Sequence, residues 1–157
     1  MSRLERIRAV VDQSLSSSTN EEALRNGFIH LYGVSATATL LARLRGLDEE
    51  LAGVAGMLHD LVTYESGDAK DHAARSATRA SEILSDLDCF TEEEIACIHS
   101  AIFHHSDKAS HGNPYEELLK DADVLQHDLY DPSFPPYSGH ETRRLRLREQ
   151  FRPRVTP

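Results

Sequence analysis

The chain has 157 residues, of which 39% are hydrophobic and 27% are charged, and its formal net charge is −9. A single domain of this size buries about two thirds of its unfolded surface in one core, so we expect one globular unit. The negative charge argues against nucleic acid as the main partner, because proteins that bind its phosphates present basic surfaces.

The sequence also limits the expected compartment and cross-links. No stretch approaches the roughly 18 to 20 apolar residues of a membrane span, and Met1 leads into an amphipathic pattern rather than a signal core. We therefore expect a cytoplasmic protein that does not enter a membrane. Cys89 and Cys97 do not form a Cys-x-x-Cys pair, so neither a disulfide framework nor a thiolate zinc site is expected.

Apolar residues at helical spacing begin directly after the N-terminus. Residues 3–15 are predicted to form a short helix that ends at a serine-rich turn. Thr19 and Glu22 have the spacing of a capping box, so a long second helix is predicted from about residue 20 to Gly46. His30 shares a face of that helix with Val34, which directs the imidazole toward the interior.

The third predicted helix starts at the acidic turn 48–50 and ends just past His59 and Asp60. After Gly67 a fourth helix is predicted to begin around residues 68–71. Its small residues, with His72 on the adjoining edge, suit close packing either within one chain or in a homodimer, and the sequence leaves both open.

The fifth predicted helix follows Thr91, which forms a capping-box pattern with Glu94. Its inward arc contains Ile102 and His105, whereas His104 points the opposite way. Of the adjacent pair, His105 is therefore the better candidate to reach a buried site.

The sixth predicted helix runs from about Tyr115 to Tyr130. On an ideal helical wheel Asp121 lies closer to the apolar arc than Asp123 does. Beyond Pro132 the composition changes to prolines and arginines, which predicts a loop, with or without a short helix, and a frayed end. The arginines between positions 143 and 154 are expected to be a solvated surface.

No segment alternates with the period of two that a strand requires, so the sequence predicts an all-α, single-domain bundle of about six helices. We divide it into an N-terminal helix and serine-rich turn (1–19), a helical domain that carries the polar motifs (20–131) and a Pro/Arg-rich C-terminal tail (132–157).

Four polar side chains recur in a fixed order on these helices, namely His30, the adjacent pair His59-Asp60, and Asp123 within Ala122-Asp123-Val124-Leu125. The order and its framing, with Gly56-Met57-Leu58 before the pair, resemble the HD superfamily of metal-dependent phosphohydrolases over roughly residues 24–130. The resemblance implies that His30, His59, Asp60 and Asp123 are metal ligands and that Asp60 also relays a proton. The helical wheel favours Asp121 and the family frame favours Asp123, and we follow the frame.

The chemistry of the implied ligands agrees with this resemblance. Two neutral imidazoles and two carboxylates suit a divalent ion such as Mn²⁺, Fe²⁺, Co²⁺, Ni²⁺, Zn²⁺ or Mg²⁺. Such an ion acidifies a bound water and polarises a phosphoryl oxygen, so attack of water on phosphorus is the expected reaction.

The segments around His72 and His105 resemble small bacterial members of the nucleotide-hydrolysing branch of that superfamily. Related binuclear subfamilies use comparable histidines for a second ion, so we consider His72, His104 and His105 candidates for a second metal or for substrate phosphate. Thr63 stands where other members carry lysine or glutamate, and Glu65 is the nearest substitute. The cations in suitable segments for phosphate binding are Lys70, Arg75, Arg79 and Lys108.

We therefore expect a metal-dependent phosphohydrolase that cleaves a phosphoester or phosphoanhydride of a small phosphorylated metabolite, with a nucleotide as the preferred interpretation. Two alternatives remain at this stage. The first is a non-catalytic HD module that binds a nucleotide or has a regulatory role, which the residue at Thr63 favours. The second is a di-iron HD-type oxygenase, which the additional histidines favour.

Overall fold

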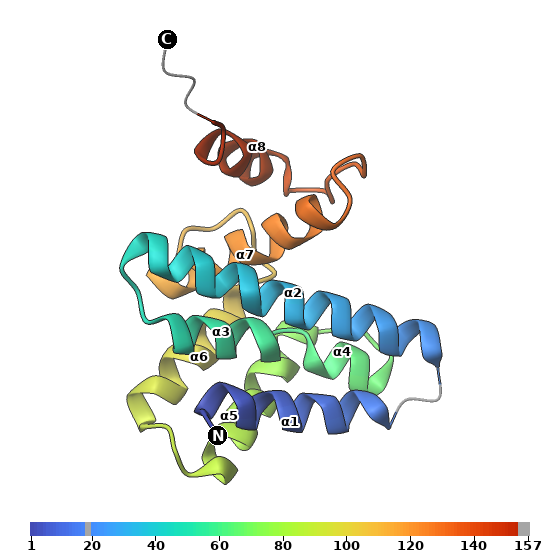
Figure 1. The fold of residues 1–157 in the computed structure, drawn as a ribbon, viewed down its shortest axis with the longest axis vertical. Helices are drawn as coiled ribbons and strands as arrows, with labels where there is room; N and C mark the ends of the chain where they lie inside the picture. The colour runs from blue at the N-terminus through green and yellow to red at the C-terminus, as the bar shows by residue number, and fades with distance from the viewer. Residues whose placement is uncertain (18–19, 154–157) are drawn as a thin grey trace.

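The computed structural model describes residues 1–17 and 20–153, and these residues form eight helices and no strand (Figure 1). The predicted all-α class is confirmed. The helices are α1 (Arg3–Ser16), α2 (Glu21–Arg45), α3 (Glu49–Leu58), α4 (Leu61–Ser66), α5 (His72–Leu87), α6 (Glu92–His104), α7 (Pro114–Tyr130) and α8 (Glu141–Gln150).

Local capping explains several of the helix boundaries. The capping box of Thr91 and Glu94 is present at the start of α6, as predicted. At α2 the N-cap is Asn20, whose side chain accepts hydrogen bonds from the next backbone N–H groups. The predicted cap residue, Thr19, lies outside the described residues.

The third helix ends close to the predicted position just past Asp60, but the short helix that follows it was not predicted. The apolar run of the third helix continues past His59, but the backbone of Asp60 leaves the helical conformation, with φ −119° and ψ 13°. The chain then forms the short helix α4, which ends at Gly67 in the left-handed conformation, where glycine carries no steric penalty. The break turns the Asp60 carboxylate away from the course of α3 and toward the centre of the bundle.

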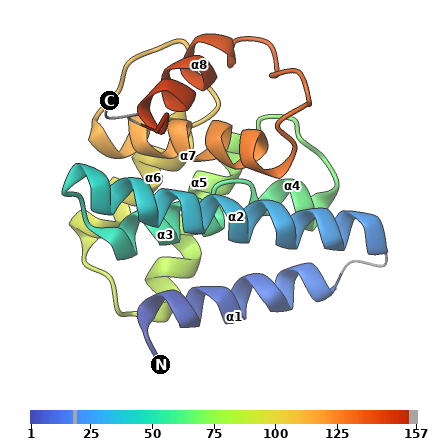
Figure 2. The same ribbon diagram turned by 45° about the horizontal axis from the view of Figure 1, so that its top comes forward.

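The long helix α2 lies at the centre of the bundle and contacts α1, α3, α4 and α7, while α5 packs on α6 (Figures 1 and 2). At Gly56 the backbones of α3 and α2 touch, since a Cβ added there would lie 2.8 Å from Cα of Ser35 and 2.9 Å from its backbone nitrogen. A glycine is therefore required at this crossing, and the close approach brings His59 within reach of His30.

The C-terminal helix α8 lies on α7 (Figure 2). Arg144 and Arg148 donate to the carboxylate of Asp128, and Arg143 and Arg146 donate to Asp121. The arginines up to position 152 are therefore largely engaged in ion pairs rather than forming the frayed, solvated surface that we expected, whereas Arg154 lies outside the described residues. None of the described helices is long and apolar enough to cross a membrane.

Candidate metal centre

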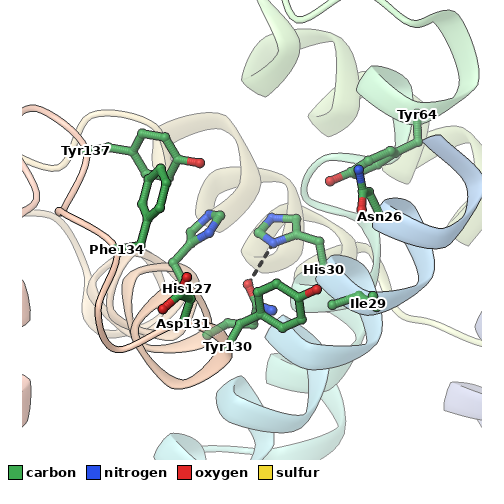
Figure 3. A pocket seen from close by; sticks show the side chains of 10 residues that line it. Asn26, Ile29, His30, Tyr64, His127, Tyr130, Asp131, Phe134 and Tyr137 are labelled. Atoms are coloured by element: carbon green, nitrogen blue, oxygen red, sulfur yellow. Dashed lines mark hydrogen bonds between the residues drawn. The ribbon is translucent and has the colours of Figure 1, made fainter. Parts of the chain in front are cut away.

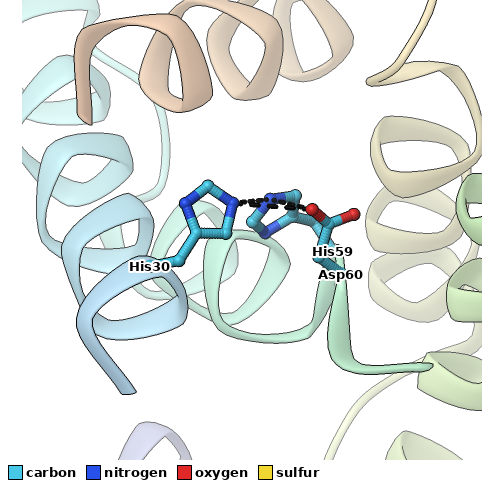
Figure 4. Close-up of side chains that lie close together, drawn as sticks. All are labelled: His30, His59 and Asp60. Atoms are coloured by element: carbon cyan, nitrogen blue, oxygen red, sulfur yellow. Dashed lines mark hydrogen bonds and ion pairs between the residues drawn. The ribbon is translucent and has the colours of Figure 1, made fainter. Parts of the chain in front are cut away.

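Four side chains from three helical segments meet in the interior of the bundle, and Figure 4 shows three of them, His30, His59 and Asp60. Nε2 of His30 lies 3.0 Å from Nε2 of His59 and 3.5 Å from Oδ2 of Asp60. Oδ1 of Asp123 lies 3.5 Å from Nε2 of His30 and 4.0 Å from Nε2 of His59. These are the four residues that the family resemblance implied, brought together although up to 93 positions separate them in the sequence.

Hydrogen bonds fix the orientation of both imidazoles. Nδ1 of His59 lies 2.8 Å from the carbonyl oxygen of Gly56, and Nδ1 of His30 lies 2.9 Å from Oε1 of Gln126. Because a carbonyl oxygen only accepts, each Nδ1 carries the proton and each Nε2 presents its lone pair to the centre. Two lone pairs at 3.0 Å repel each other unless a proton or a cation lies between them.

Burial and the neighbouring carboxylates determine how readily the His30 and His59 rings take up a proton. Burial lowers the pKa of His59 to about 3, and the neighbouring Asp60 carboxylate opposes that shift only in part. Burial also acts to lower the pKa of His30, but the Asp60 and Asp123 carboxylates outweigh it and raise the pKa above its ordinary value. The two rings of the centre therefore differ in proton affinity, His30 being the more basic and His59 the less basic.

The two carboxylates remain ionised although they are buried. Burial acts to raise both pKa values, but the His59, His105 and His30 rings lower that of Asp60 well below its ordinary range. The Lys108 ammonium, 2.5 Å from Oδ2 of Asp123, lowers the pKa of Asp123 in the same way. The donor set therefore consists of neutral imidazole nitrogens and anionic oxygens, which fits a divalent ion of borderline or hard character.

A second group of donors shares Asp60 with the first. Oδ1 of Asp60 lies 3.2 Å from Nε2 of His105 and 3.5 Å from Nε2 of His72. Both rings are held at Nδ1 by backbone carbonyl oxygens, those of Ile102 and Ala69. Oδ1 is buried and has no well-directed hydrogen bond within the described residues, which fits a second cation between these three side chains.

The structure does not bring His104 to this centre. Its side chain is 47% exposed, and its Nδ1 lies 3.2 Å from Glu116, so it faces away from the centre as the helical wheel indicates. Asp121 is buried, but three arginines, Arg45, Arg143 and Arg146, pair with its carboxylate. The inward position of Asp121 on the wheel reflects this ion-pair cluster and not the metal centre.

Among the predicted phosphate-binding cations, only Lys108 lies at the centre. Arg75 donates to the backbone oxygens of residues 68 and 70 and so holds the loop before α5. Lys70 is exposed in that loop, and Arg79 lies 3.6 Å from Glu65. Glu65 also accepts from Ser14 and belongs to none of the donor clusters of the described residues, so it does not replace the missing acid at Thr63.

Sequence reasoning missed His127, which lies one turn after Asp123 on α7. Its Nε2 is 3.4 Å from Oδ1 of Asp123, and its ring centroid is 4.8 Å from that of His30. The spacing of four residues would have placed both side chains on one helix face. Gln126, which orients His30, was also missed, because nothing in its local sequence marks it as a partner of α2.

A cavity of about 330 Å³ opens beside the metal centre at His30 and His127 (Figure 3). Its other walls are mainly aromatic. The lining residues are Asn26, Ile29, His30, Tyr64, Gln126, His127, Tyr130, Asp131, Phe134 and Tyr137.

The helical bundle and the interior His/Asp clusters define an all-α protein whose side chains are positioned to hold a metal ion. A family model described as HD domain matches residues 27–128, and the chain belongs to that family. Members of this family are generally metal-dependent hydrolases of the phosphohydrolase superfamily. No curated protein and no solved structure gives a significant match to the chain.

Proposed function

We propose that this protein is a metal-dependent phosphohydrolase that cleaves a phosphoester or phosphoanhydride of a small phosphorylated metabolite, specifically a nucleotide. One observation carries the proposal, namely that four imidazole nitrogens, each ring held at Nδ1 by a carbonyl oxygen, converge on the two oxygens of Asp60, with the buried Asp123 carboxylate beside two of them. The aromatic cavity next to this centre supports the nucleotide as the substrate class.

In this proposal His30, His59, Asp60 and Asp123 hold one divalent ion, and Asp60, His72 and His105 hold a second. Divalent ions in such sites supply Lewis acidity, which acidifies water and polarises a phosphoryl oxygen. The backbone carbonyl oxygens and Gln126 keep the imidazoles in the tautomer that binds metal.

The position of Asp60 changes the role that the sequence suggested for it. A proton relay requires a carboxylate oxygen that is open to the reacting water, but Oδ1 faces His105 and His72 and Oδ2 faces His30 and His59. We therefore assign Asp60 to bridging the two clusters. Lys108 has a supporting role, since its buried ammonium holds Oδ2 of Asp123 and leaves Oδ1 directed toward the histidines.

The experiment combines metal analysis with turnover. Purified protein is analysed for metal per chain and is assayed for phosphate and pyrophosphate release on a panel of nucleotides and sugar phosphates. His59→Ala and Asp60→Asn should lose bound metal and at least about 100-fold of turnover, because each removes a donor to the ion. His111→Ala is the matched control, because that side chain is 88% exposed and belongs to no donor cluster of the described residues. Unchanged metal content and turnover in both site variants would refute the proposal.

A di-iron oxygenase is the second candidate, and the second cluster at Asp60 favours it, since two ions bridged by a carboxylate also suit oxygen chemistry. Oxygen uptake that depends on an organic substrate, in protein containing two irons per chain and releasing no phosphate, would support this alternative. Metal retention with neither activity would instead indicate a binding module without catalysis.

A further inference from the structure

We propose that the cavity beside the metal centre binds the base of the nucleotide, and that the segment 131–140 is the wall that selects for it. This inference rests on the proposed function and adds the part of the protein that chooses the substrate. The segment follows the region matched by the HD domain model, which ends at residue 128, so the match assigns it no role.

The cavity joins the metal centre directly. His30 and His127 lie at its inner end, and both approach Oδ1 of Asp123 within 3.5 Å. A phosphate held at the centre would therefore place the adjoining part of the same molecule in the cavity. Figure 3 shows Tyr64 and Asn26 on one side of this space and Phe134 and Tyr137 on the other.

Three of the four Phe and Tyr side chains that line the cavity are more than half exposed to solvent. Tyr130, Phe134 and Tyr137 are 60%, 53% and 51% exposed, although they gather at one cavity. The ring contacts of Phe134 and Tyr137 are tilted or edge-on, with planes at 51° for Phe134 and Tyr137 and at 74° for Tyr137 and His127. Ring faces thus remain available to a planar ligand, which would gain both stacking and apolar burial.

The polar side chains of Asp131 and Asn26 line the cavity together with these aromatic rings. Oδ1 of Asp131 accepts from the backbone N–H and the hydroxyl of Ser133, which fixes this carboxylate as an acceptor at the cavity. Asn26 also lines the cavity and offers both a donor and an acceptor. A nucleobase presents a planar face together with donors and acceptors at its edge, whereas a simple sugar phosphate has no planar face.

The wall is held in place by α8. Arg144 donates to Asp128 and to the backbone carbonyl oxygens of Pro132 and Phe134. Arg148 donates to Asp128 and to the carbonyl oxygen of Pro132. Arg144 and Arg148 are therefore positioning residues, which orient the wall without lining the metal centre.

The test measures binding separately from turnover. Metal-free protein is titrated with adenosine, guanosine, cytidine and uridine, and in parallel with ribose 5-phosphate, by isothermal titration calorimetry. At least one nucleoside should bind more tightly than ribose 5-phosphate. Phe134→Ala should weaken nucleoside binding about tenfold, which is the effect expected from losing one stacking side chain.

Phe103→Ala is the matched control, because Phe103 is 46% exposed, lies on α6 and does not line the cavity. It should leave nucleoside binding unchanged. Both substituted side chains are largely exposed, so both variants are expected to fold. Equal nucleoside affinities for wild type and Phe134→Ala would overturn the inference, as would ribose 5-phosphate binding at least as tightly as every nucleoside.

Failure of the two proposals can be told apart. Nucleoside binding that is sensitive to Phe134, in a protein that hydrolyses no nucleotide, would refute the proposed function and leave the base site intact. Hydrolysis of nucleotides and ribose 5-phosphate with the same kcat/KM, unchanged by Phe134→Ala, would refute the base site and leave the hydrolase intact.

Discussion

Replacing Gly56 with alanine tests whether the backbone contact between α2 and α3 sets the geometry of the metal centre. The added Cβ would lie 2.8 Å from Cα of Ser35, 2.9 Å from its nitrogen and 2.9 Å from the carbonyl carbon of Val34. All three atoms belong to the backbone of α2 and cannot rotate away. Since comfortable carbon contacts begin at about 3.5 Å, the two helices must separate by roughly 0.7 Å.

The expected magnitudes follow from this separation. Overpacking costs about 1–3 kcal/mol, and the higher helix propensity of alanine returns about 1 kcal/mol, so a net loss of stability of about 1 kcal/mol is expected. Metal sites tolerate distance errors of only about 0.2 Å. Moving His59 relative to His30 by several times that amount should therefore weaken metal binding about 10- to 100-fold, as loss of a supporting contact does.

Gly53→Ala is the matched control on the same helix. Its added Cβ would lie 2.8 Å from Oγ1 of Thr39, the end of a side chain, and its next neighbour is at 3.4 Å. The assay is a Mn²⁺ titration by calorimetry together with urea unfolding followed by circular dichroism. Gly56→Ala should lose both metal affinity and stability, and Gly53→Ala should keep both. Equal Mn²⁺ affinity in Gly56→Ala and wild type would refute the reasoning.

Three further predictions concern the ion pairs and the second group of donors around the metal centre. Asp121→Asn should cost about 2 kcal/mol of stability, because it takes one of two carboxylate partners from the buried Arg143 and weakens the pairing of the more exposed Arg45 and Arg146. It should keep bound metal, whereas Asp123→Asn should lose it. Metal analysis and urea unfolding decide, and metal loss in Asp121→Asn would contradict the assignment. His105→Ala should lower the metal content from two ions per chain to one, measured by elemental analysis, and an unchanged stoichiometry would exclude the second site. The Arg148 and Arg144 guanidiniums hold the pKa of Asp128 below its ordinary value of 3.8. The ion pairs of Asp128 therefore stabilise the docking of α8 fully above pH 3.8. This stabilisation is lost as the pH falls through the lowered pKa of Asp128. An acid titration followed by NMR signals of Tyr137 should show this release in wild type and not in Asp128→Asn, and identical titrations would contradict it.

The helical class and most boundaries could be predicted from the sequence because they depend on local interactions. The capping box at Thr91 lies within a few residues, and amphipathic spacing repeats within each helix. The end of the third helix near Asp60 was predicted, but the short helix α4 was not, because six residues without a side-chain cap carry little local signal. The docking of α8 was missed for a similar reason, since an arginine run does not show which acids it will meet.

The order of His30, His59-Asp60 and Asp123 in the sequence was enough to indicate the chemistry, because ligand types follow from residue types. The tertiary structure decided which atoms meet. It placed Asp121 among arginines and brought His127 and Gln126 to the centre. Such contacts join helices distant in the chain, and the distance and direction between helices depend on close packing such as that at Gly56, which no local pattern encodes.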